Sequence, residues 1–313
     1  MKHKIEELVG EGRVRENVDL FPYLLMRLHT QAQYFFEAKT AQDLINAYRA
    51  CKQNNIPFFL LGGGTNAVFK ASRVEGLLVK NLYSEITTLF SDSTSSLVMI
   101  ASGTPTSLVV LKTVEAGLSG FSYHKGLPGQ MGGAIYMNSK WTKPFSYIGD
   151  NLVEATLIDT EGNIKKVDKT YFKFSHGYSI LQTTHEILVD ATFKLPKQDK
   201  AVLSAQAEGA FSYRKETQPI GVATCGCFFR NITEEERTAH NLPYRSAGYL
   251  IDKAGMKGYV VGGFSVSDKH ANFIINSGKG EARPEDLMTL VATIKEKVKG
   301  KFGIILKEEV ELF

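Results

Sequence analysis

Two glycine-rich segments of this 313-residue chain have the composition of loops that bring their backbone close to a ligand. Residues 126–138 hold four glycines and a proline within their first eight positions and then become apolar. Residues 62–66, Gly-Gly-Gly-Thr-Asn, follow the apolar run 58–61. Glycine at this density indicates positive φ angles or the close approach of another group, because it is otherwise unfavourable for the backbone. Two such loops, each preceded by a predicted strand, indicate a large ligand with phosphates or a flat ring.

The backbone N–H groups of residues 62–66 could form a concave anion site, because no Cβ atom blocks the approach of phosphate oxygens. The Thr65 hydroxyl and the Asn66 amide would add donors. The loop lacks the G-x-G-x-x-G spacing and the strand-then-helix context of a Rossmann domain. A plain turn between strands explains the same residues, and this alternative stays open at this point.

The sequence Cys225-Gly226-Cys227 contains two of the three cysteines of the chain. A C-x-C pair without further cysteines or a histidine cluster is a poor zinc site, and a disulfide across one residue would be strained. We therefore predict no metal. Cys227 is a candidate proton donor, because a thiol with a pKa of about 8.5 releases its proton far more readily than an alcohol.

Further candidates are glutamates near the C-terminus and two of the histidines. Glu308, Glu309 and Glu311 belong to a predicted strand, in which alternation places Glu309 and Glu311 on one face. Composition alone selects none of the three, since most glutamates on exposed strands are solvated. The histidines show no metal spacing, and only His176 and His270 lie near other candidate residues.

Hydrophobic periodicity predicts the elements that position these residues. In the N-terminal part we expect helices over 40–54, 106–116 and 199–216. Strands are expected over 58–61, 77–79, 97–101 and 186–195, with a hairpin over 152–158 and 164–167. The first helix begins with a capping-box pattern at Thr40 and Asp43, and Cys51 on its apolar face is expected to be a core residue.

In the C-terminal part, strands are expected to dominate from residue 224 onward, over 227–230, 259–264, 272–276 and 302–313. An amphipathic helix over 283–299 interrupts them, with Pro284 in its first turn and Gly300 just past its end. The domain boundary is expected near 196–206. The predicted fold class is α+β, with a two-lobed ligand-binding domain followed by a C-terminal domain.

The composition, 43% hydrophobic and 22% charged, is that of an ordinary globular protein. The net charge of +4 is spread along the chain, so we predict no nucleic-acid-binding surface, although the charge would suit an anionic substrate. The N-terminus lacks the apolar core of a signal peptide, and no window has the length of a transmembrane helix. Because the three cysteines have no framework spacing either, we predict a cytoplasmic protein without a membrane partner.

In their order along the chain, the motifs resemble those of the UDP-N-acetylenolpyruvoylglucosamine reductase family, flavoenzymes of bacterial peptidoglycan synthesis. The resemblance covers nearly the whole chain. Its motifs are residues 61–66, 127–134, 218–219, 225–231, 246–252, 256–258, 269–276 and 303–310. The short spacing from Phe174 to Cys227 is similar to the form of the family that lacks an extra substrate-covering loop.

The resemblance implies a two-lobed FAD-binding domain of the vanillyl-alcohol-oxidase (PCMH) type over residues 1–200, with lobes of about 1–82 and 83–200. An α+β substrate-binding domain would follow over 201–313. FAD would be bound non-covalently, NADPH would be the electron donor, and the protein would be a monomer. The substrate would be a UDP-sugar, the enolpyruvyl ether of UDP-N-acetylglucosamine, which is reduced to UDP-N-acetylmuramate. Hydride adds to C3 and a proton to C2, and the charge that develops at C2 must be stabilised.

The resemblance also implies the site residues. Cys227 aligns with a serine that donates the proton, and Glu309 with a glutamate that polarises the substrate carboxylate. The substrate-binding positions are Lys215, Arg230, Asn231 and His270. Lys215 suits a phosphate, as a point charge on a flexible stem. The cofactor-binding positions are Gly62, Gly63, Gly64, Thr65, Asn66, Pro128, Gly129, Gly132, Gly133, Ala134 and Asn138.

One departure from the family concerns the catalytic cation. Where the family has a Tyr-Arg pair before a serine, this chain has His176-Gly177, so the expected arginine is a glycine. Shifting the alignment by one places Ser179 there and still gives no arginine. We expect His176 or Lys215 to supply the positive charge instead. The departure keeps two alternatives open: another flavin oxidoreductase of this fold with a different sugar or hydroxy-acid substrate, and an impaired homologue that binds flavin and UDP-sugar without hydride transfer.

Overall fold

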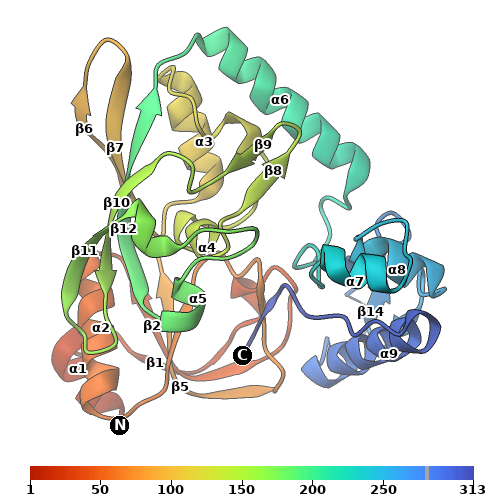
Figure 1. Ribbon diagram of the computed structural model, residues 1–313. Coiled ribbons are helices and arrows are strands. Elements are labelled where there is room, and N and C mark those ends of the chain that lie inside the picture. Colours follow the sequence, from red (N-terminus) through yellow and green to blue (C-terminus); the bar gives the residue numbers. More distant parts are fainter. Residues whose placement is uncertain (279–281) are drawn as a thin grey trace. The chain divides into compact units, whose positions relative to one another are not determined.

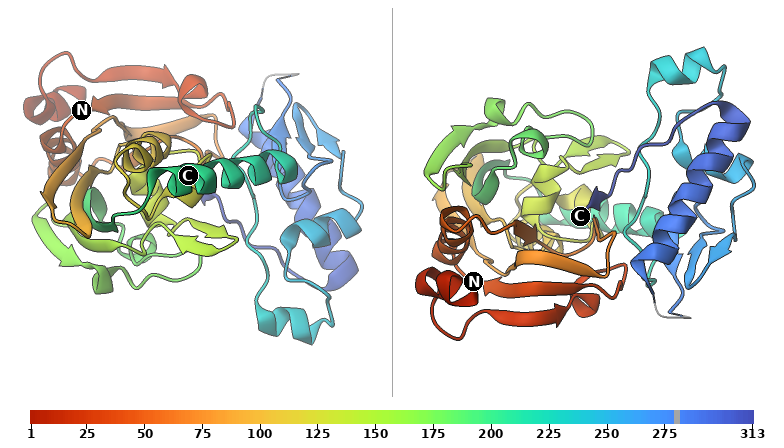
Figure 2. Two further views of the ribbon diagram at one scale, coloured as in Figure 1. Left: turned by 90° about the horizontal axis from the view of Figure 1, so that it is seen from above. Right: turned by 90° about the horizontal axis from the view of Figure 1, so that it is seen from below.

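The computed structural model describes residues 1–278 and 282–313, which form two compact units. Unit 1 contains residues 1–17, 33–63 and 75–214, and unit 2 contains residues 18–32, 64–74 and 215–313. The division falls inside three strands, β1 (Arg15–Asp19), β2 (Gln31–Ala38) and β5 (Arg73–Asn81), and inside the long helix α6 (Lys200–Thr217) (Figure 1, Figure 2). The functional boundary expected near 196–206 therefore lies at the start of α6 and stays a prediction.

The first sheet has the strand order β1-β2-β5-β3, in which β3 (Phe58–Leu61) runs parallel to β5. Helices α1 (Lys2–Val9) and α2 (Ala41–Gln53) pack side by side (Figure 1) and share an apolar core with this sheet. The predicted capping box of α2 is confirmed, since Thr40 and Asp43 exchange side-chain-to-backbone hydrogen bonds of 3.1 Å. Cys51 is buried in this core as predicted, and burial raises the pKa of its thiol to about 12.

The second sheet of unit 1 is antiparallel throughout. Its order is β11 (Ile164–Asp168), β10 (Leu152–Ile158), β12 (Ile187–Pro196), β7 (Ser95–Ala101) and β6 (Ile86–Ser91). Helices α3 (Thr106–Glu115) and α4 (Met131–Tyr136) contribute to the same core as Ile100, Leu157 and Phe193. The predicted hairpin, helix 106–116 and strand 186–195 are confirmed to within a residue or two. The remaining elements of unit 1 are β8 (Lys140–Thr142), β9 (Phe145–Tyr147), α5 (Leu181–Thr184) and 3-10 turns at Ser122–His124 and Lys169–Phe172.

Unit 2 is built around helix α9 (Pro284–Phe302), whose predicted apolar face, from Leu287 to Val298, is buried. An antiparallel sheet of β13 (Val260–Val261), β14 (Phe264–Val266) and β15 (Ile274–Asn276) packs with α9. The other elements of unit 2 are α7 (Glu234–Ala239), α8 (Ala247–Lys253), a 3-10 turn at Phe21–Tyr23, and the parallel pair β4 (Ala67–Val68) and β16 (Glu311–Leu312).

The expectation that strands dominate after residue 224 is wrong. Residues 227–230 form single bridges, Cys227 to Phe273 and Phe229 to Glu308, because alternate residues pair with different neighbours. The strand expected over 259–264 is a hairpin instead, which turns at Gly262 with a φ of 54°. Of the strand expected over 302–313, only Glu311–Leu312 is regular, because Gly303 ends a helix and the pairing near Glu308 is limited to a single bridge with Phe229.

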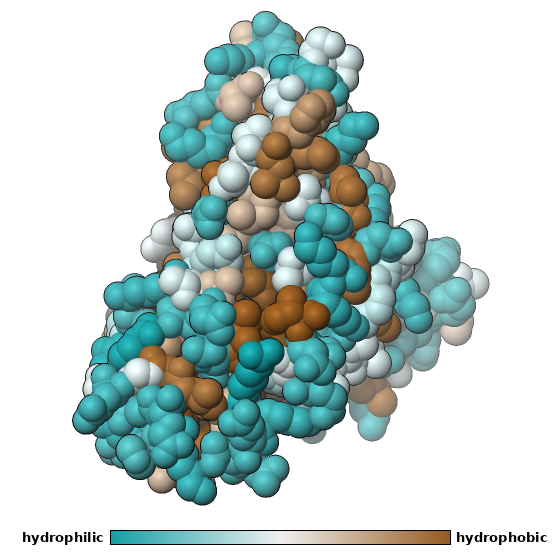
Figure 3. Space-filling model, turned by 90° about the vertical axis from the view of Figure 1, so that its left-hand side faces the viewer, coloured by the Kyte–Doolittle hydropathy of each residue, from teal (hydrophilic) through white to brown (hydrophobic). Residues whose placement is uncertain are grey.

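The surface in Figure 3 is largely hydrophilic, and its apolar side chains gather in separate patches. Within residues 1–278 and 282–313, no helix combines the length and the apolar composition that crossing a membrane requires.

The predicted end of α9 at Gly300 is also wrong. The helix passes through Gly300, which is exposed, and stops at Gly303, whose φ of 71° and N–H bond to the Lys299 carbonyl form its C-cap. Only the second glycine takes a left-handed conformation, so only that position needs glycine.

This difference predicts opposite effects of two alanine substitutions. Gly300→Ala should raise the free energy of unfolding by about 0.5–1 kcal/mol, since alanine is the better helix former. Gly303→Ala should lower it by about 1 kcal/mol because of the left-handed φ. Urea unfolding followed by circular dichroism measures both. A loss of stability in the first variant would contradict the helix end seen here.

Candidate functional site

In unit 1 the segment 126–138 is fixed by backbone hydrogen bonds to the loop that follows β7. The N–H groups of Met131 and Gly132 donate to the carbonyl oxygens of Thr104 (2.9 Å) and Ser102 (2.7 Å). This close approach leaves little room for a side chain, since a Cβ atom on Gly132 would lie 3.0 Å from the Ser102 carbonyl oxygen. Gly132 thus brings two backbone segments together, and its predicted contact with the cofactor stays a prediction.

Gly133 is the residue of this segment that borders open space. It is exposed, and a Cβ atom built on it would meet no protein atom within 4 Å. Its neighbour Ala134 is buried, whereas Pro128 is exposed beside Gly129, which has a φ of 101°. No protein atom occupies the space beside Gly133, and its predicted contact with the cofactor stays a prediction.

A buried polar atom next to the segment has no hydrogen-bond partner among the described residues. The Gln130 side-chain amide donates to the Asn81 carbonyl oxygen (3.0 Å), but its Oε1 is buried and accepts no hydrogen bond. The same oxygen would lie 2.9 Å from a Cβ atom on Gly62, so the first glycine loop approaches Gln130 closely. An unsatisfied buried carbonyl costs about 1–3 kcal/mol, which favours a ligand N–H group at this place.

Lys80 fixes the orientation of the first glycine loop in unit 1. Its ammonium donates to the carbonyl oxygen of Gly62, and burial lowers the pKa of Lys80. Because the peptide unit is planar and trans, a Gly62 carbonyl held by Lys80 turns the Gly63 N–H to the opposite side. The loop therefore presents a donor away from its protein support, as an anion site requires.

In the part of this loop that belongs to unit 2, a hydrogen-bonded carbonyl again sets the direction of the N–H group that follows it. The Gly64 carbonyl oxygen accepts from the Leu25 N–H (2.9 Å), which turns the Thr65 N–H away from Leu25. Glycine is obligatory at position 64, because its φ is 66° and a Cβ atom would lie 2.0 Å from the Tyr23 carbonyl oxygen. Asn66 donates through Nδ2 to the Glu309 carbonyl oxygen (3.3 Å).

Asn138 connects the glycine segment to a second loop of unit 1, residues 175–179. Its Nδ2 donates to the Ser175 carbonyl oxygen (3.0 Å), and its Oδ1 accepts from the Gly149 N–H (3.2 Å). The hydroxyl of buried Ser179 donates to the Tyr136 carbonyl oxygen (2.8 Å). The amide of Asn138 is thus engaged within the protein at both ends, and its predicted contact with the cofactor stays a prediction.

His176 and Gly177 lie at the tip of this second loop. A bridge between Ser175 and Tyr178 closes the tip, and Gly177 has a φ of 68° with open space where a Cβ atom would be. His176 is exposed, and its imidazole contacts the ammonium of Lys140 on strand β8. The structure therefore brings a lysine to the position next to the missing arginine.

In unit 2 the predicted catalytic residues Cys227 and Glu309 lie on adjacent backbone segments. The Glu309 N–H donates to the carbonyl oxygen of Phe228, the residue after Cys227 (2.8 Å). Glu308, which the sequence could not separate from Glu309, is paired with Lys295 at 2.8 Å. Because the Glu308 carboxylate is bound by α9, it is the less suitable of the two for a ligand.

The two thiols of the Cys-Gly-Cys motif have different surroundings. Cys225 is buried, and burial raises its pKa to about 12, whereas Cys227 is half-buried. Gly226 between them has a φ of 83°. Neither forms a disulfide, and no group of His, Cys, Asp or Glu side chains within the described residues could hold a metal ion.

The predicted substrate-binding residues belong to unit 2 and differ in exposure. Arg230 is exposed and donates through Nε to the Glu308 carbonyl oxygen (3.0 Å). The Asn231 side chain accepts from the Ala247 N–H (3.1 Å). His270 stacks edge-on against Phe273, and burial lowers the pKa of its imidazole. Lys215 is exposed on α6, and its carbonyl oxygen binds the Lys269 ammonium at 2.6 Å.

The sequence reasoning missed Arg214, a buried cation of unit 1. Only 8% of it is exposed, its guanidinium lies 5.1 Å from the Trp141 ring, and its Nε has no hydrogen-bond partner within the described residues. Burial lowers its pKa, and burial together with Arg214 lowers the pKa of neighbouring His124 to about 3. A buried charge without a counterion is unfavourable, so an anionic ligand would stabilise it. The signal in the sequence is its spacing, because the buried positions of α6 are Leu203, Ala207, Ala210 and Arg214.

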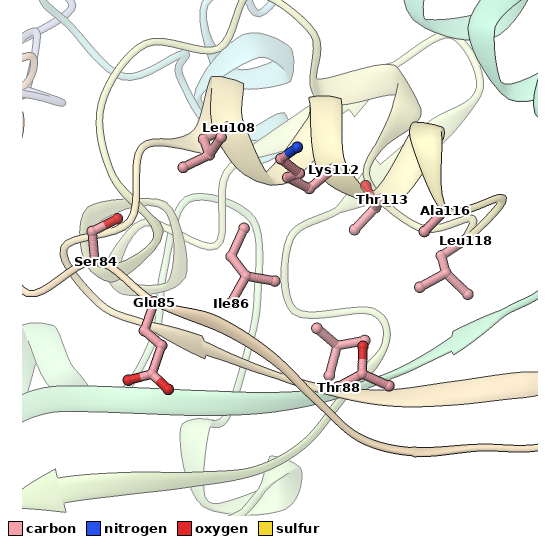
Figure 4. Close-up of a pocket in the computed structure, with 10 residues that line it drawn as sticks. Ser84, Glu85, Ile86, Thr88, Leu108, Lys112, Thr113, Ala116 and Leu118 are labelled. Carbon is pink, nitrogen blue, oxygen red and sulfur yellow. The ribbon is translucent and has the colours of Figure 1, made fainter.

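A separate pocket of unit 1 contains none of the predicted site residues. It measures about 320 Å³ and lies between α3 and the start of β6 (Figure 4). Its walls are formed by apolar side chains such as Ile86 and Leu108, with Glu85 and Lys112 at the side. It offers neither the glycine backbone nor the thiol that distinguish the candidate site.

Comparisons with known proteins agree with this geometry. Residues 218–313 match the family model described as UDP-N-acetylenolpyruvoylglucosamine reductase, C-terminal domain, and residues 32–168 match an FAD binding domain. The reductase of that name from Protochlamydia amoebophila is 33% identical over 89% of this chain and 87% of its own length. The one from Caldanaerobacter subterraneus is 31% identical over 99% of this chain and 96% of its own. The chain belongs to the UDP-N-acetylenolpyruvoylglucosamine reductase family.

Structural similarity supports the assignment to this family and the predicted fold class. The crystal structure of the UDP-N-acetylenolpyruvylglucosamine reductase from Thermus caldophilus has a TM-score of 0.77 and 25% identity, covering 96% of this chain and 99% of that one. p-Cresol methylhydroxylase shares the fold at a TM-score of 0.53 and 11% identity, over 94% of this chain and 86% of that one. The predicted PCMH-type FAD-binding domain with a C-terminal α+β domain is confirmed.

The residues of unit 1 fit the FAD that this family of domains binds. The orphaned Oε1 of Gln130 offers an acceptor, the outward Gly63 N–H offers a donor, and Gly133 leaves room for a flat ring or a phosphate. Arg214 adds a buried positive charge. The donor set is thus complementary to a large anionic group with both N–H and carbonyl functions.

Gly133→Ala tests where the cofactor lies. The added methyl group meets no protein atom, so the unfolding temperature of the flavin-free protein should stay the same or rise, while FAD affinity should fall by at least tenfold. Gly209→Ala in α6 is the matched control, since its methyl group also meets open space. Flavin fluorescence titration gives the affinities. If both variants bind FAD as the native chain does, Gly133 does not contact the cofactor.

Proposed function

We propose that this chain reduces the enolpyruvyl ether of UDP-N-acetylglucosamine to UDP-N-acetylmuramate, with NADPH as the electron donor, in peptidoglycan synthesis. The observation that supports this most strongly is the full-length relationship to reductases of this name, together with a thiol and a carboxylate on adjacent segments of unit 2. FAD, when bound, accepts hydride from NADPH and supplies it to C3 of the substrate. The other chemical tasks belong to side chains of the protein.

Cys227 is the proposed proton donor to C2. Hydride addition at C3 leaves negative charge at C2 that is delocalised into the carboxylate, and a general acid completes the reaction there. A half-buried thiol is accessible to a ligand, whereas the buried Cys225 thiol is not. The sequence difference from the family, cysteine for serine, therefore keeps a proton-donating group at this position.

Glu309 is proposed to polarise the substrate carboxylate. Its backbone N–H donates to the Phe228 carbonyl oxygen, and its own carbonyl oxygen accepts from Asn66 Nδ2. These two bonds fix the position of its Cα atom relative to Cys227. A carboxylate close to the substrate carboxylate is effective only where cations balance it, and the cations Lys215 and Arg230 are proposed, with Asn231 and His270, for binding the UDP-sugar.

We also propose that the protein is a cytoplasmic monomer without membrane or nucleic-acid partners. The charge of +4 without a concentrated basic segment supports the last point. A UDP-sugar and NADPH are intracellular metabolites, which supports the first.

The proposed function is tested by anaerobic half-reactions of the native chain. NADPH should bleach the flavin absorbance, and the enolpyruvyl UDP-sugar should restore it rapidly. A flavin that stays reduced after the UDP-sugar is added would support the impaired homologue. Reoxidation by another sugar or hydroxy acid only would support the other oxidoreductase.

Cys227→Ala should slow flavin reoxidation by the substrate by about 10²–10⁴-fold and leave flavin reduction by NADPH unchanged, because only the first step needs a proton at C2. Cys227→Ser should retain most of the rate. Cys225→Ala is the matched control at the neighbouring buried thiol. Stopped-flow absorbance of the flavin measures both half-reactions, and equal slowing by the alanine variants at 225 and 227 would argue against a proton donor at 227.

His176→Ala and Lys215→Ala separate the two cations expected to replace the arginine. Replacing the residue that acts on the developing charge should slow flavin reoxidation by about 100-fold at saturating substrate. The residue that only binds phosphate should raise KM with kcat unchanged. Steady-state kinetics distinguishes them, and an unchanged turnover in His176→Ala would remove the histidine from the reaction.

A further inference from the structure

We propose that Lys140 carries the positive charge that faces the carboxylate of the substrate, and that His176 holds its ammonium in place. This inference rests on the proposed function and assigns to it a residue that the sequence pattern does not reveal. It is carried by the contact between Lys140 and His176 and by the way the loop 175–179 is fastened to the glycine segment.

The loop is fixed on the end of α4 by several hydrogen bonds. Gln182 Nε2 bridges the carbonyl oxygens of Tyr136 and Gly177 at 2.9 Å each, and Ser179 adds its hydroxyl bond to Tyr136. Asn138 binds the opposite end of the loop at Ser175. The tip is therefore a defined structure, and Lys140 approaches it from a strand that begins two residues after Asn138.

The contact determines which of the two side chains is charged. A lysine ammonium has no lone pair and can only donate, so the ring nitrogen that it contacts must be the acceptor. In this arrangement the positive charge belongs to Lys140, in place of the expectation that His176 is itself the cation. Lys140 Nζ lies 3.3 Å from Nδ1 of His176 and also contacts Nε2.

Whether Lys140 can face the substrate depends on the geometry of unit 1 alone. The carbon that receives hydride must lie against the flavin ring, so side chains around the flavin-binding segment face the reacting end of the substrate. Of the lysines near that segment, Lys80 is bound to the Gly62 carbonyl, and Lys143 lies over the Tyr213 ring at 4.9 Å. Lys140 is a lysine whose ammonium contacts the loop tip, at His176 beside Gly177.

Gly177 itself provides an independent check. A side chain there would extend into open space, although the φ of 68° makes any residue but glycine strained. An arginine introduced at this position would carry its own guanidinium to the same loop tip. The second cation should therefore compensate in part for the loss of the first.

The test compares the binding of two UDP-sugars that differ in the carboxylate. UDP-N-acetylmuramate carries it and UDP-N-acetylglucosamine does not. In Lys140→Met, calorimetry of the FAD-loaded protein should show affinity for the first ligand falling by about tenfold or more and affinity for the second changing by less than about twofold. Lys140→Arg should bind both nearly as the native chain does. Lys143→Met on the same hairpin is the matched control and should be unaffected.

Rates complete the test. Lys140→Met should slow flavin reoxidation by substrate by about 100-fold without changing flavin reduction by NADPH, and Gly177→Arg in that background should recover part of the loss. Equal weakening of both UDP-sugars, or no weakening of either, would overturn the inference about Lys140. A native chain that binds neither UDP-sugar, or that never reoxidises, would instead contradict the proposed function.

Discussion

The C-terminal half of the candidate site depends on the side-chain amide of Asn272. Its Oδ1 accepts from the Phe229 N–H (2.9 Å), and its Nδ2 donates to the Phe229 carbonyl oxygen (2.8 Å), with only 3% of the residue exposed. The segment 227–231 lacks a continuous strand partner, so this amide does the work of a sheet neighbour. Without it, two buried backbone groups would lose their hydrogen bonds, which costs more than the bonds themselves contribute. The positions of Cys227 and of the Glu309 backbone follow from this contact.

In unit 1 the glycine segment is fixed to residues 102–104 in a different way, because glycine allows backbone to bind backbone. Residues 102–104 accept the N–H groups of residues 131–132 at 2.7–2.9 Å, a distance that a Cβ atom on Gly132 would disturb. The cost is the conformational entropy of a glycine-rich chain, and the core around Met131 and Ile135 offsets it by burying apolar area. The rigid support explains how an exposed Gly133 can be presented to a ligand.

Local rules recovered much of this from the sequence, and the failures among the strands share a cause. The helix 41–53 was predictable because Thr40 and Asp43 have the residue types and spacing of a capping box. The hairpin of β10 and β11 was predictable because apolar and polar residues alternate regularly along it. The prediction of strands after residue 224 was wrong because pairing there depends on partners distant in sequence, which hydrophobic periodicity does not indicate. Cys227 and Glu309 were found through family resemblance. Lys140 was not, because nothing in its neighbours along the chain indicates contact with a loop 36 residues later.

The two departures from the family pattern are chemically different kinds of change. A proton donor must deliver an atom, so its replacement has to occupy nearly the same place, as the proposed donor Cys227 would in place of serine. The turn at Gly226 separates this half-buried thiol from the buried Cys225. A charge acts through space, so it can be supplied from a different element provided that it reaches the same point. Loss of an arginine at position 177 is therefore tolerable in a fold that brings a lysine from β8 to the same loop tip, whereas loss of the thiol would have no such remedy.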